Sequence, residues 1–303
     1  MIIKRKAVYD NILSIPAGTR GAFTVEHVAH PAGHVFSLAT ARTRIMGGHA
    51  GGRVSYDHPT TWHRLTEENR VWMSDYPIEQ AQHDRELAGV RHGRVLIGGL
   101  GLGYAATILS RRGGVREVVI VEKARDVVDL VAPHLVADDA AARAKLTIVC
   151  ADLFDYLREL PACHRFEHAF YDIWASDGEG TFFQTVVPLL RLSQGRVHAA
   201  PICWNESVMR GQLFHSLQGR WLSLSMPHAG AATLDKLCEL TGSFWLTWSA
   251  PFFRWARAAR PDVARFDEMA GLYAGAYGRP SFLDTWQLVA GETVPELEVS
   301  ADA

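Results

Sequence analysis

A glycine-rich loop is the first feature of this sequence that could do chemistry. In RVLIGGLGLGY, Gly99, Gly101 and Gly103 follow an apolar run and precede a stretch of helical pattern that begins at Tyr104. Glycines at such a junction allow a tight turn and let backbone N–H groups approach a ligand closely. The loop by itself does not identify a ligand, because a turn that contacts nothing would use the same residues.

Three acidic residues stand at the ends of the apolar runs that follow the loop. Glu122 ends VVIVE, about 20 residues beyond the loop, where a nucleotide-binding domain presents a carboxylate to ribose hydroxyls. Asp152 follows TIVCA and could accept a hydrogen bond from the amine of an adenine. Asp172, in AFYDIW, falls at the edge of the expected sheet where ligands bind, although it could equally cap the following turn. The pattern predicts a nucleoside site, and the GxGxxA form of residues 101–106 leaves NAD open as the ligand.

The elements that position these residues form an alternating pattern. From residue 93 onward, apolar runs alternate with helical stretches, which is typical of a parallel sheet covered on both faces. We therefore expect a doubly wound, Rossmann-like α/β domain. The expected strands are residues 94–97, 117–122, 146–150, 168–173 and 196–200, and the expected helices are residues 104–112, 125–135, 154–160, 182–192, 208–217 and 231–240.

The N-terminal part of the chain predicts a small antiparallel β domain. Its expected strands are residues 23–29, 35–46, 54–56 and 71–74, with Pro59 and residues 66–69 in connections. Pro77 suits the first turn of a helix that would run to about residue 88. These patterns divide the chain into a β domain at 1–76 and an α/β domain at 77–303, whose C-terminal extension includes a candidate strand in SFLDTWQLVAG.

Four motifs together resemble the class I S-adenosylmethionine (SAM)-dependent methyltransferases, and more narrowly their spermidine-synthase-like branch. They are VLIGGLGLG, VVIVEK, VCADLFDYL and FYDIW, and the resemblance extends over residues 73–200. That branch also has a small N-terminal β domain and a Tyr-His-Glu helix, to which MSDYPIEQAQHDREL is similar. The resemblance implies SAM as cofactor. By the resemblance, Gly99, Gly101 and Gly103 would hold the methionine part of SAM, and Glu122 would bind the ribose. Asp152 and Leu153 would bind the adenine, and Asp172 would face the acceptor.

Two departures from that branch bear on the reaction. Aminopropyltransferases have a GGGDG loop whose Asp holds the sulfonium ligand, and this chain has Leu102 in the matching place. They also follow the catalytic strand with Asp-Ser-Ser-Asp-Pro, whereas residues 172–177 here are longer and lack the proline. We therefore expect methyl transfer with Asp172 as the catalytic residue. Aminopropyl transfer from decarboxylated SAM is the second hypothesis, a nucleoside-binding protein without catalysis the third, and NAD-dependent reduction the fourth.

Residues outside the nucleoside motifs are candidates for binding the acceptor, which we expect to be a small molecule or a peptide. Asp177 lies in a glycine-bearing loop and could hold a cationic amine, or could simply be a solvated charge. His83 would face the mouth of the site by the resemblance, with an ordinary surface histidine as the alternative. Tyr76 could form an aromatic wall with Trp62 and His63, although most aromatic residues pack in cores.

Composition limits the remaining classes of function. Thirty-one Lys and Arg oppose 33 Asp and Glu, so the net charge of −2 gives no reason to expect nucleic acid as a partner. No apolar run is long enough to span a bilayer, and we expect a cytoplasmic protein that does not bind membranes. The four cysteines and 14 histidines include no paired-cysteine or HExxH spacing, so no metal site is expected. Exposed β edges and the resemblance both favour a homodimer.

Overall fold

The computed structural model describes residues 2–3, 12–37, 53–68, 70–161, 166–174 and 185–206. The chain divides into two compact units, one of residues 1–175 with 192–205 and one of residues 176–191 with 206–303. The first unit holds nearly all of the described residues, including both larger sheets and the glycine loop. The division at residues 76 and 77 stays a prediction, and the C-terminal helices and strand predicted beyond residue 206 lie outside the described residues.

A five-stranded parallel sheet forms the centre of the first unit. Its order is β10-β9-β8-β11-β12, and every neighbouring pair is parallel. Strands β9 and β10 are added to one side of β8, and β11 and β12 are added to its other side. The order in which the chain adds strands therefore reverses between β8 and β11. Open α/β sheets bind ligands outside the carboxyl ends of their strands at such a switch point. The strands are β8 (Gly93–Gly98), β9 (Val115–Glu122), β10 (Leu146–Cys150), β11 (His168–Tyr171) and β12 (Ile202–Cys203).

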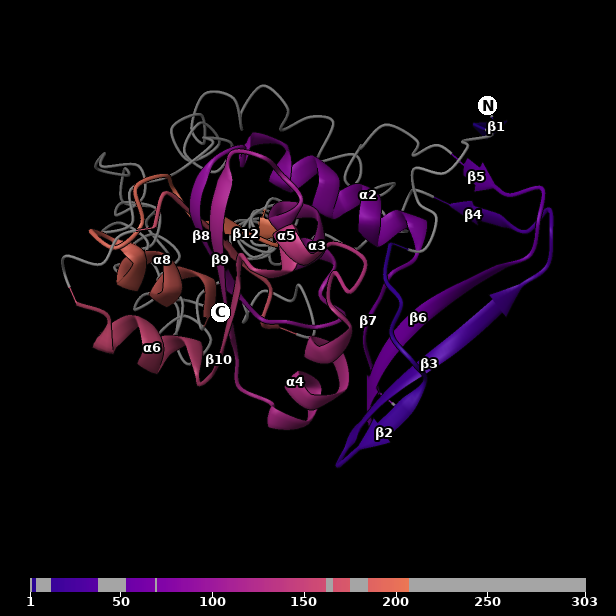
Figure 1. Ribbon diagram of the computed structural model, residues 1–303, viewed down its shortest axis with the longest axis horizontal. Coiled ribbons are helices and arrows are strands. Elements are labelled where there is room, and N and C mark those ends of the chain that lie inside the picture. Colours follow the sequence, from indigo (N-terminus) through magenta and orange to yellow (C-terminus); the bar gives the residue numbers. More distant parts are fainter. Residues whose placement is uncertain are drawn as a thin grey trace, which may run out of the picture. The chain divides into compact units, whose positions relative to one another are not determined.

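Helices lie on both sides of this sheet. Figure 1 shows α3 and α4 on one side and α6 on the other. This arrangement confirms the predicted α/β class with a parallel sheet. The helices are α2 (Pro77–Glu86), α3 (Tyr104–Ser110), α4 (Arg125–Val131), α5 (Ala140–Arg143), α6 (Leu153–Glu159) and α8 (Val187–Ser193), with 3-10 turns η1 (Leu87–Gly89) after α2 and η2 (Ala132–His134) after α4.

The N-terminal residues form the predicted antiparallel sheet, in the order β2-β3-β6-β7. A second, small sheet has the order β1-β5-β4. One hydrophobic core includes Val25 and Leu65 of the antiparallel sheet together with Val127 and Val131 of α4. The strands of the two sheets are β1 (Ile2–Ile3), β2 (Gly18–Arg20), β3 (Phe23–His30), β4 (Val35–Ser37), β5 (Arg53–Ser55), β6 (Thr60–Glu67) and β7 (Arg70–Ser74).

Strand β6 corrects the predicted connection at residues 66–69, because Thr66 and Glu67 belong to the strand. The strand pairs with β3 over eight residues, from Thr60 to Glu67. Both of its faces contain buried residues, and the register shifts between Leu65 and Thr66 where it pairs with β7. A strand covered on both faces and interrupted by a bulge does not show the alternation of apolar and polar residues by which a half-buried strand is found.

The last strand of the parallel sheet is also displaced from its predicted position at residues 196–200. The structure has a single bridge between Val197 and Phe166 there, and the strand itself is β12, beyond Pro201. The N–H groups of His198 and Ala199 donate to the carbonyl groups of Phe166 and Glu167, just before β11. Pro201 has no N–H to continue the ladder, which separates this short pairing from β12.

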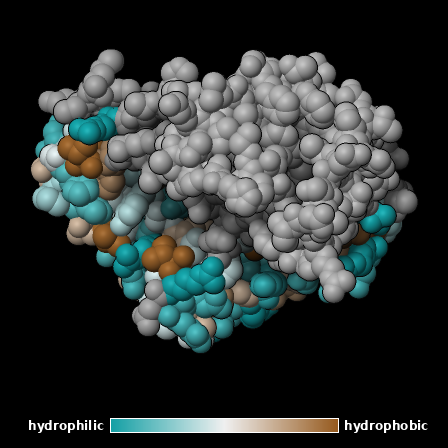
Figure 2. All heavy atoms as spheres, turned by 180° about the vertical axis from the view of Figure 1, so that it is seen from behind, coloured by the Kyte–Doolittle hydropathy of each residue, from teal (hydrophilic) through white to brown (hydrophobic). Residues whose placement is uncertain are grey.

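The surface of the described residues is mainly polar. Figure 2 shows mostly hydrophilic atoms with small, separate hydrophobic areas where that side of the described chain is visible. Val35 and Val71 are the exposed large hydrophobic residues in the described part, at 44% and 48%. None of the described helices is long and apolar enough to cross a membrane. The predicted homodimer stays a prediction.

Candidate functional site

The glycine loop lies at the carboxyl end of β8 and is packed against the protein at each of its three glycines. Gly99, Gly101 and Gly103 have φ values of +92°, +50° and +77°, a region that residues with a Cβ rarely adopt. A Cβ at Gly99 would overlap the carbonyl oxygen of Asp172, and one at Gly101 would overlap Met73 Sδ. The glycines are therefore required by the internal packing of the loop, whether or not a ligand also uses them.

Glu122 fastens this loop to the end of β9. Its Oε2 accepts the N–H of Leu100 at 2.9 Å, and its Oε1 accepts the N–H of Ala124 at 2.8 Å. The loop is held further by the N–H of Gly99, which donates to the carbonyl of Val121 at 2.9 Å. The structure thus brings the predicted ribose carboxylate into direct contact with the predicted glycine loop.

Leu102, which departs from the aminopropyltransferase loop, belongs to the core. Its side chain is 0% exposed, so it packs inside the protein and presents nothing to a ligand above the loop. Its N–H donates instead to Met73 Sδ at 3.1 Å. An acidic side chain at this position would place a charge in an apolar core, which is costly unless the charge is paired.

Asp152 follows β10, as predicted, and is the N-cap of α6, which begins at Leu153, one residue before the predicted start. Asp152 is exposed and caps the helix, since its Oδ1 accepts the N–H groups of Phe154 at 2.8 Å and Asp155 at 3.3 Å. Its Oδ2 takes no part in the cap. Leu153 is buried, and its side chain packs against Gly98 at the end of β8.

Asp172 and His83, predicted separately from distant parts of the sequence, form a pair. His83 Nε2 lies 3.6 Å from Asp172 Oδ2, and the two side chains are 4% and 20% exposed. His83 Nδ1 lies 2.9 Å from the carbonyl oxygen of Glu79, and because a carbonyl only accepts, Nδ1 carries a proton. Nε2 therefore faces the Asp172 carboxylate at the switch point of the sheet.

The pairing with Asp172 makes His83 more basic than usual. Burial alone lowers the pKa of the imidazole, but the close contact with the Asp172 carboxylate, its negative charge and the Glu79 carbonyl outweigh this effect, so the net pKa is raised. Aromatic rings hold His83 in place, with Tyr104 and Phe170 at centroid distances of 5.6 and 5.5 Å. The geometry favours an imidazolium that orients the carboxylate of Asp172.

Glu79 is a member of this group that the sequence pattern did not reveal. Its carboxylate accepts the N–H of Ser74 at 3.0 Å and the hydroxyl of Ser74 at 2.7 Å. Burial raises the pKa of Glu79 to about 7, although the Ser74 bonds and His83 oppose the shift. Glu79 and His83 are four residues apart on α2 and therefore share a helix face, which is the signal that could have found Glu79 once His83 was chosen.

Glu79→Gln is expected to change how stability depends on pH. The pKa of Glu79 in the fold, about 7, exceeds its ordinary value of 4.5. The stabilisation from its protonated form is therefore complete below pH 4.5 and is lost as the pH rises through about 7. Glutamine stays neutral, so the variant should gain about 1–3 kcal/mol relative to wild type across that window, at about 1.4 kcal/mol per pKa unit. Urea unfolding at pH 4.5 to 8 measures the difference.

Ser74→Ala gives the matched test of this effect. It removes the hydroxyl that donates to Glu79 and opposes the shift, so the pH-dependent loss of stability should move to a higher pH. A difference between Glu79→Gln and wild type that is constant over the whole window would contradict the raised pKa.

Two of the three residues of the predicted aromatic wall are buried, and Tyr76 is partly buried. Trp62 and His63 are 1% and 5% exposed, which agrees with the core alternative. His63 Nδ1 lies 2.6 Å from Asp75 Oδ2, and the backbone N–H of His63 donates to Asp75 Oδ1 at 2.6 Å, so this pair ties β6 to the segment before α2. The ring of Tyr76 packs near Phe36, with centroids 6.0 Å apart, and burial raises the pKa of its hydroxyl. A role for Tyr76 in substrate binding stays a prediction, and Asp177 lies outside the described residues.

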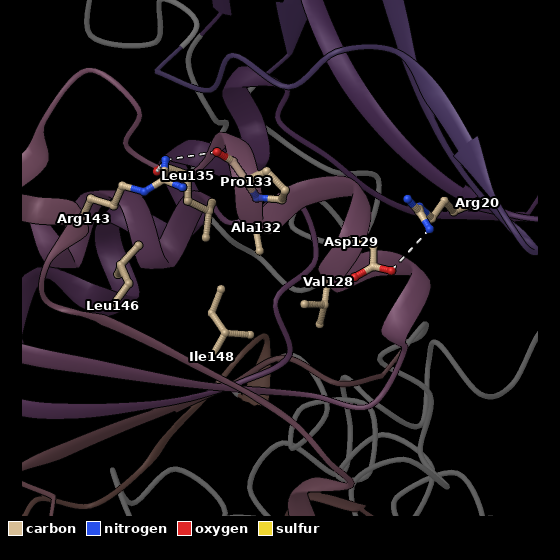
Figure 3. Close-up of a pocket in the computed structure, with 9 residues that line it drawn as sticks. All are labelled: Arg20, Val128, Asp129, Ala132, Pro133, Leu135, Arg143, Leu146 and Ile148. Atoms are coloured by element: carbon tan, nitrogen blue, oxygen red, sulfur yellow. Dashed lines mark hydrogen bonds and ion pairs between the residues drawn. The ribbon is translucent and has the colours of Figure 1, made fainter.

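A pocket of about 600 Å³ lies elsewhere, between α4 and the edge strand β10. Figure 3 shows apolar side chains of both elements pointing into it, with the Arg20–Asp129 ion pair at one side. None of the predicted site residues lines this pocket, so it is separate from the glycine loop. Its lining consists of Arg20, Val128, Asp129, Ala132, Pro133, Leu135, Arg143, Leu146 and Ile148. No group of three or more metal-ligating side chains occurs among the described residues.

Comparison with known proteins gives only distant structural similarity. No protein-family model and no curated protein matches the chain. A putative O-methyltransferase from Klebsiella pneumoniae has 17% identity over 38% of this chain and 50% of its own, with a TM-score of 0.30. The glycopeptide N-methyltransferase MtfA has 19% identity over 40% of this chain and 50% of its own, with a TM-score of 0.30. Precorrin 8W decarboxylase from Methanobacterium thermoautotrophicum has 16% identity over 39% of this chain and 56% of its own, with a TM-score of 0.29. Each match spans about half of the other chain, and similarity this low says nothing about the reaction of this one.

Proposed function

We propose that this chain binds SAM along the carboxyl ends of β10, β9 and β8 and transfers its methyl group to a small-molecule or peptide acceptor beside β11. The strand order supports this, because it sets the candidate residues in one line across the sheet edge. Asp152 follows β10, Glu122 ends β9, the glycine loop follows β8, and Asp172 follows β11. An adenosyl ligand has its parts in the same order, with adenine, ribose and 5′ substituent.

The observation that carries the proposal is the bond between Glu122 and the N–H of Leu100 at 2.9 Å. It puts a carboxylate in contact with the loop itself, and Asp172, whose backbone carbonyl lies against Gly99, carries a second carboxylate at the end of β11. A cationic sulfonium is attracted by such a site, whereas the negative charges of a diphosphate are repelled by it. The charges therefore favour SAM over NAD.

The residues around Asp172 suit the remaining task of the reaction. When bound, SAM supplies a methyl group that its sulfonium already makes electrophilic. Asp172 would orient the nucleophile of the acceptor and take its proton, and His83 would hold Asp172 in position through its Nε2. The Nδ1–H of His83 is anchored on the Glu79 carbonyl, which fixes the ring that carries out this orientation.

Isothermal titration with SAM, its demethylated product S-adenosylhomocysteine, and NADH tests the ligand. We expect both adenosyl compounds to bind and NADH not to bind; the reverse result would refute the proposal. Transfer of labelled methyl groups to fractionated metabolite and peptide extracts then tests the reaction. Tight binding without transfer to any fraction would favour a nucleoside-binding protein over an enzyme.

Asp152→Asn is expected to weaken binding of S-adenosylhomocysteine without unfolding the helix. Asparagine caps helices as well as aspartate, so Phe154 and Asp155 keep their acceptor. The amide nitrogen then replaces Oδ2 and opposes the donor amine of adenine, which should cost about tenfold in affinity, or about 1.4 kcal/mol. Titration measures the affinity, and urea unfolding checks the fold.

Two further variants separate capping from ligand binding. Asp152→Ala should lose the same affinity and also about 1 kcal/mol of stability, because the cap is removed. Asp139 caps α5 through the N–H of Ala142, so Asp139→Asn is the matched control and should leave both quantities unchanged. Unchanged affinity in Asp152→Asn would assign Asp152 to capping alone.

A further inference from the structure

The thioether of Met73 lies directly on the glycine loop. Met73 belongs to β7, in the antiparallel sheet, and its Sδ occupies the position that a Cβ of Gly101 would take. The same sulfur accepts the N–H of Leu102 at 3.1 Å. Its side chain is partly buried and packs against the main core. One residue from a neighbouring sheet therefore covers the loop and uses one of its donors.

The position of Met73 matters for the part of an adenosyl ligand beyond the ribose. With adenine at Asp152 and ribose at Glu122, the 5′ substituent reaches the loop after β8. The amino-acid tail of SAM ends in a carboxylate, which needs backbone donors. The N–H of Leu100 is already bonded to Glu122, and the N–H of Leu102 is bonded to Met73.

A tail carboxylate can take the N–H of Leu102 only if the thioether of Met73 moves away. The hydrogen bond itself favours the exchange, because a thioether sulfur is a weak acceptor and a carboxylate a strong one. The loss of packing of Met73 over Gly101 opposes it. The net cost falls on ligands that carry the tail and not on ligands that lack it.

We propose that Met73 is a selectivity-determining residue that discriminates among adenosyl ligands by their 5′ substituents. It lowers the affinity for ligands with an amino-acid carboxylate and leaves unaffected the affinity for 5′-methylthioadenosine, which has no such tail. The inference rests on the proposed adenosyl site and names a residue that the reaction itself does not use.

Titration of the full chain with S-adenosylhomocysteine and with 5′-methylthioadenosine tests the proposal. Met73→Ala should bind S-adenosylhomocysteine about tenfold more tightly than wild type, or about 1.4 kcal/mol, while the affinity for 5′-methylthioadenosine stays within about twofold. Met73→Leu keeps most of the volume over Gly101, so its affinity for S-adenosylhomocysteine should stay within about threefold of wild type. Val71→Ala changes an exposed residue of the same strand and should alter neither affinity.

A second measurement follows the side chain directly. In the NMR spectrum of wild-type protein labelled at methionine methyl groups, the methyl resonance of Met73 is identified by its absence from the spectrum of Met73→Leu. It should shift when S-adenosylhomocysteine binds and stay in place when 5′-methylthioadenosine binds. This readout uses the wild-type fold, so it remains decisive if Met73→Ala unfolds.

The possible results distinguish failure of the proposed role of Met73 from failure of the proposed adenosyl site. Parallel changes in both affinities in Met73→Ala, or a Met73 signal that S-adenosylhomocysteine does not move, would overturn the role of Met73 while the adenosyl site stands. Failure of wild type and of every variant to bind either compound would overturn the adenosyl site, and the role of Met73 with it.

Discussion

Asp172→Asn is expected to lower the rate of methyl transfer about 100- to 10,000-fold, the range found when a general base is removed. The amide keeps the shape of the side chain but cannot take a proton from the acceptor. It also replaces the charge that faces His83 Nε2 at 3.6 Å, so the orientation of the pair is lost. Single-turnover transfer of labelled methyl groups, with an acceptor fraction found active for wild type, measures the effect.

Binding separates a chemical role of Asp172 from a structural one. S-adenosylhomocysteine should bind Asp172→Asn within about threefold of wild type, because the proposed adenine and ribose contacts lie at the ends of other strands. Asp138→Asn, an exposed aspartate paired with Arg111, is the control and should keep full activity. If Asp172→Asn binds the product normally and transfers methyl groups at the wild-type rate, Asp172 only caps the turn that follows β11.

Strands β8 to β11 of the parallel sheet were predictable because each one is marked by a run of neighbouring apolar residues. Strand β9 is buried on both faces over residues 118–121 and appears in the sequence as a continuous apolar run. Both β9 and β10 end at the predicted residues, Glu122 and Cys150. Strand β6 was not predictable in the same way. Its buried His63 pairs with Asp75, which follows the neighbouring strand β7, and no alternation within β6 reveals such a partner.

The candidate site was predictable where a strand end marks it and hidden where another element approaches it. Asp172 and Glu122 stand at the ends of strands, which periodicity locates. Met73 and Glu79 reach the site from β7 and α2, and their contacts depend on how the antiparallel sheet packs beside the glycine loop. That packing is a property of the folded chain, so neither residue stands out in the sequence.

The loop glycines illustrate how one residue type supports two interpretations. Their number and position predicted close approach of a ligand, while the structure places internal neighbours against Gly99, Gly101 and Gly103. Both requirements follow from the missing Cβ and the positive φ. The internal one can be measured without knowing the ligand.

Gly99→Ala is expected to lower the free energy of unfolding by about 2–5 kcal/mol. About 1–2 kcal/mol comes from placing a residue with a Cβ at a φ of +92°. A further 1–3 kcal/mol, roughly, comes from the overlap of that Cβ with the carbonyl oxygen of Asp172, which is backbone and cannot rotate away. Urea unfolding, with the slope of the transition checked against wild type, measures the loss.

Two other glycines resolve this loss into its parts. Gly33 has a φ of +79°, and no described atom lies within 4 Å of a Cβ there, so Gly33→Ala should show the backbone cost alone. Gly113 has open space and no positive φ, so Gly113→Ala should be neutral or slightly stabilising. Equal losses in Gly99→Ala and Gly33→Ala would mean that the Asp172 carbonyl gives way. A larger loss in Gly99→Ala would mean that contact with the loop fixes the backbone of Asp172, so that the glycine sets the position of the proposed base as well as the turn.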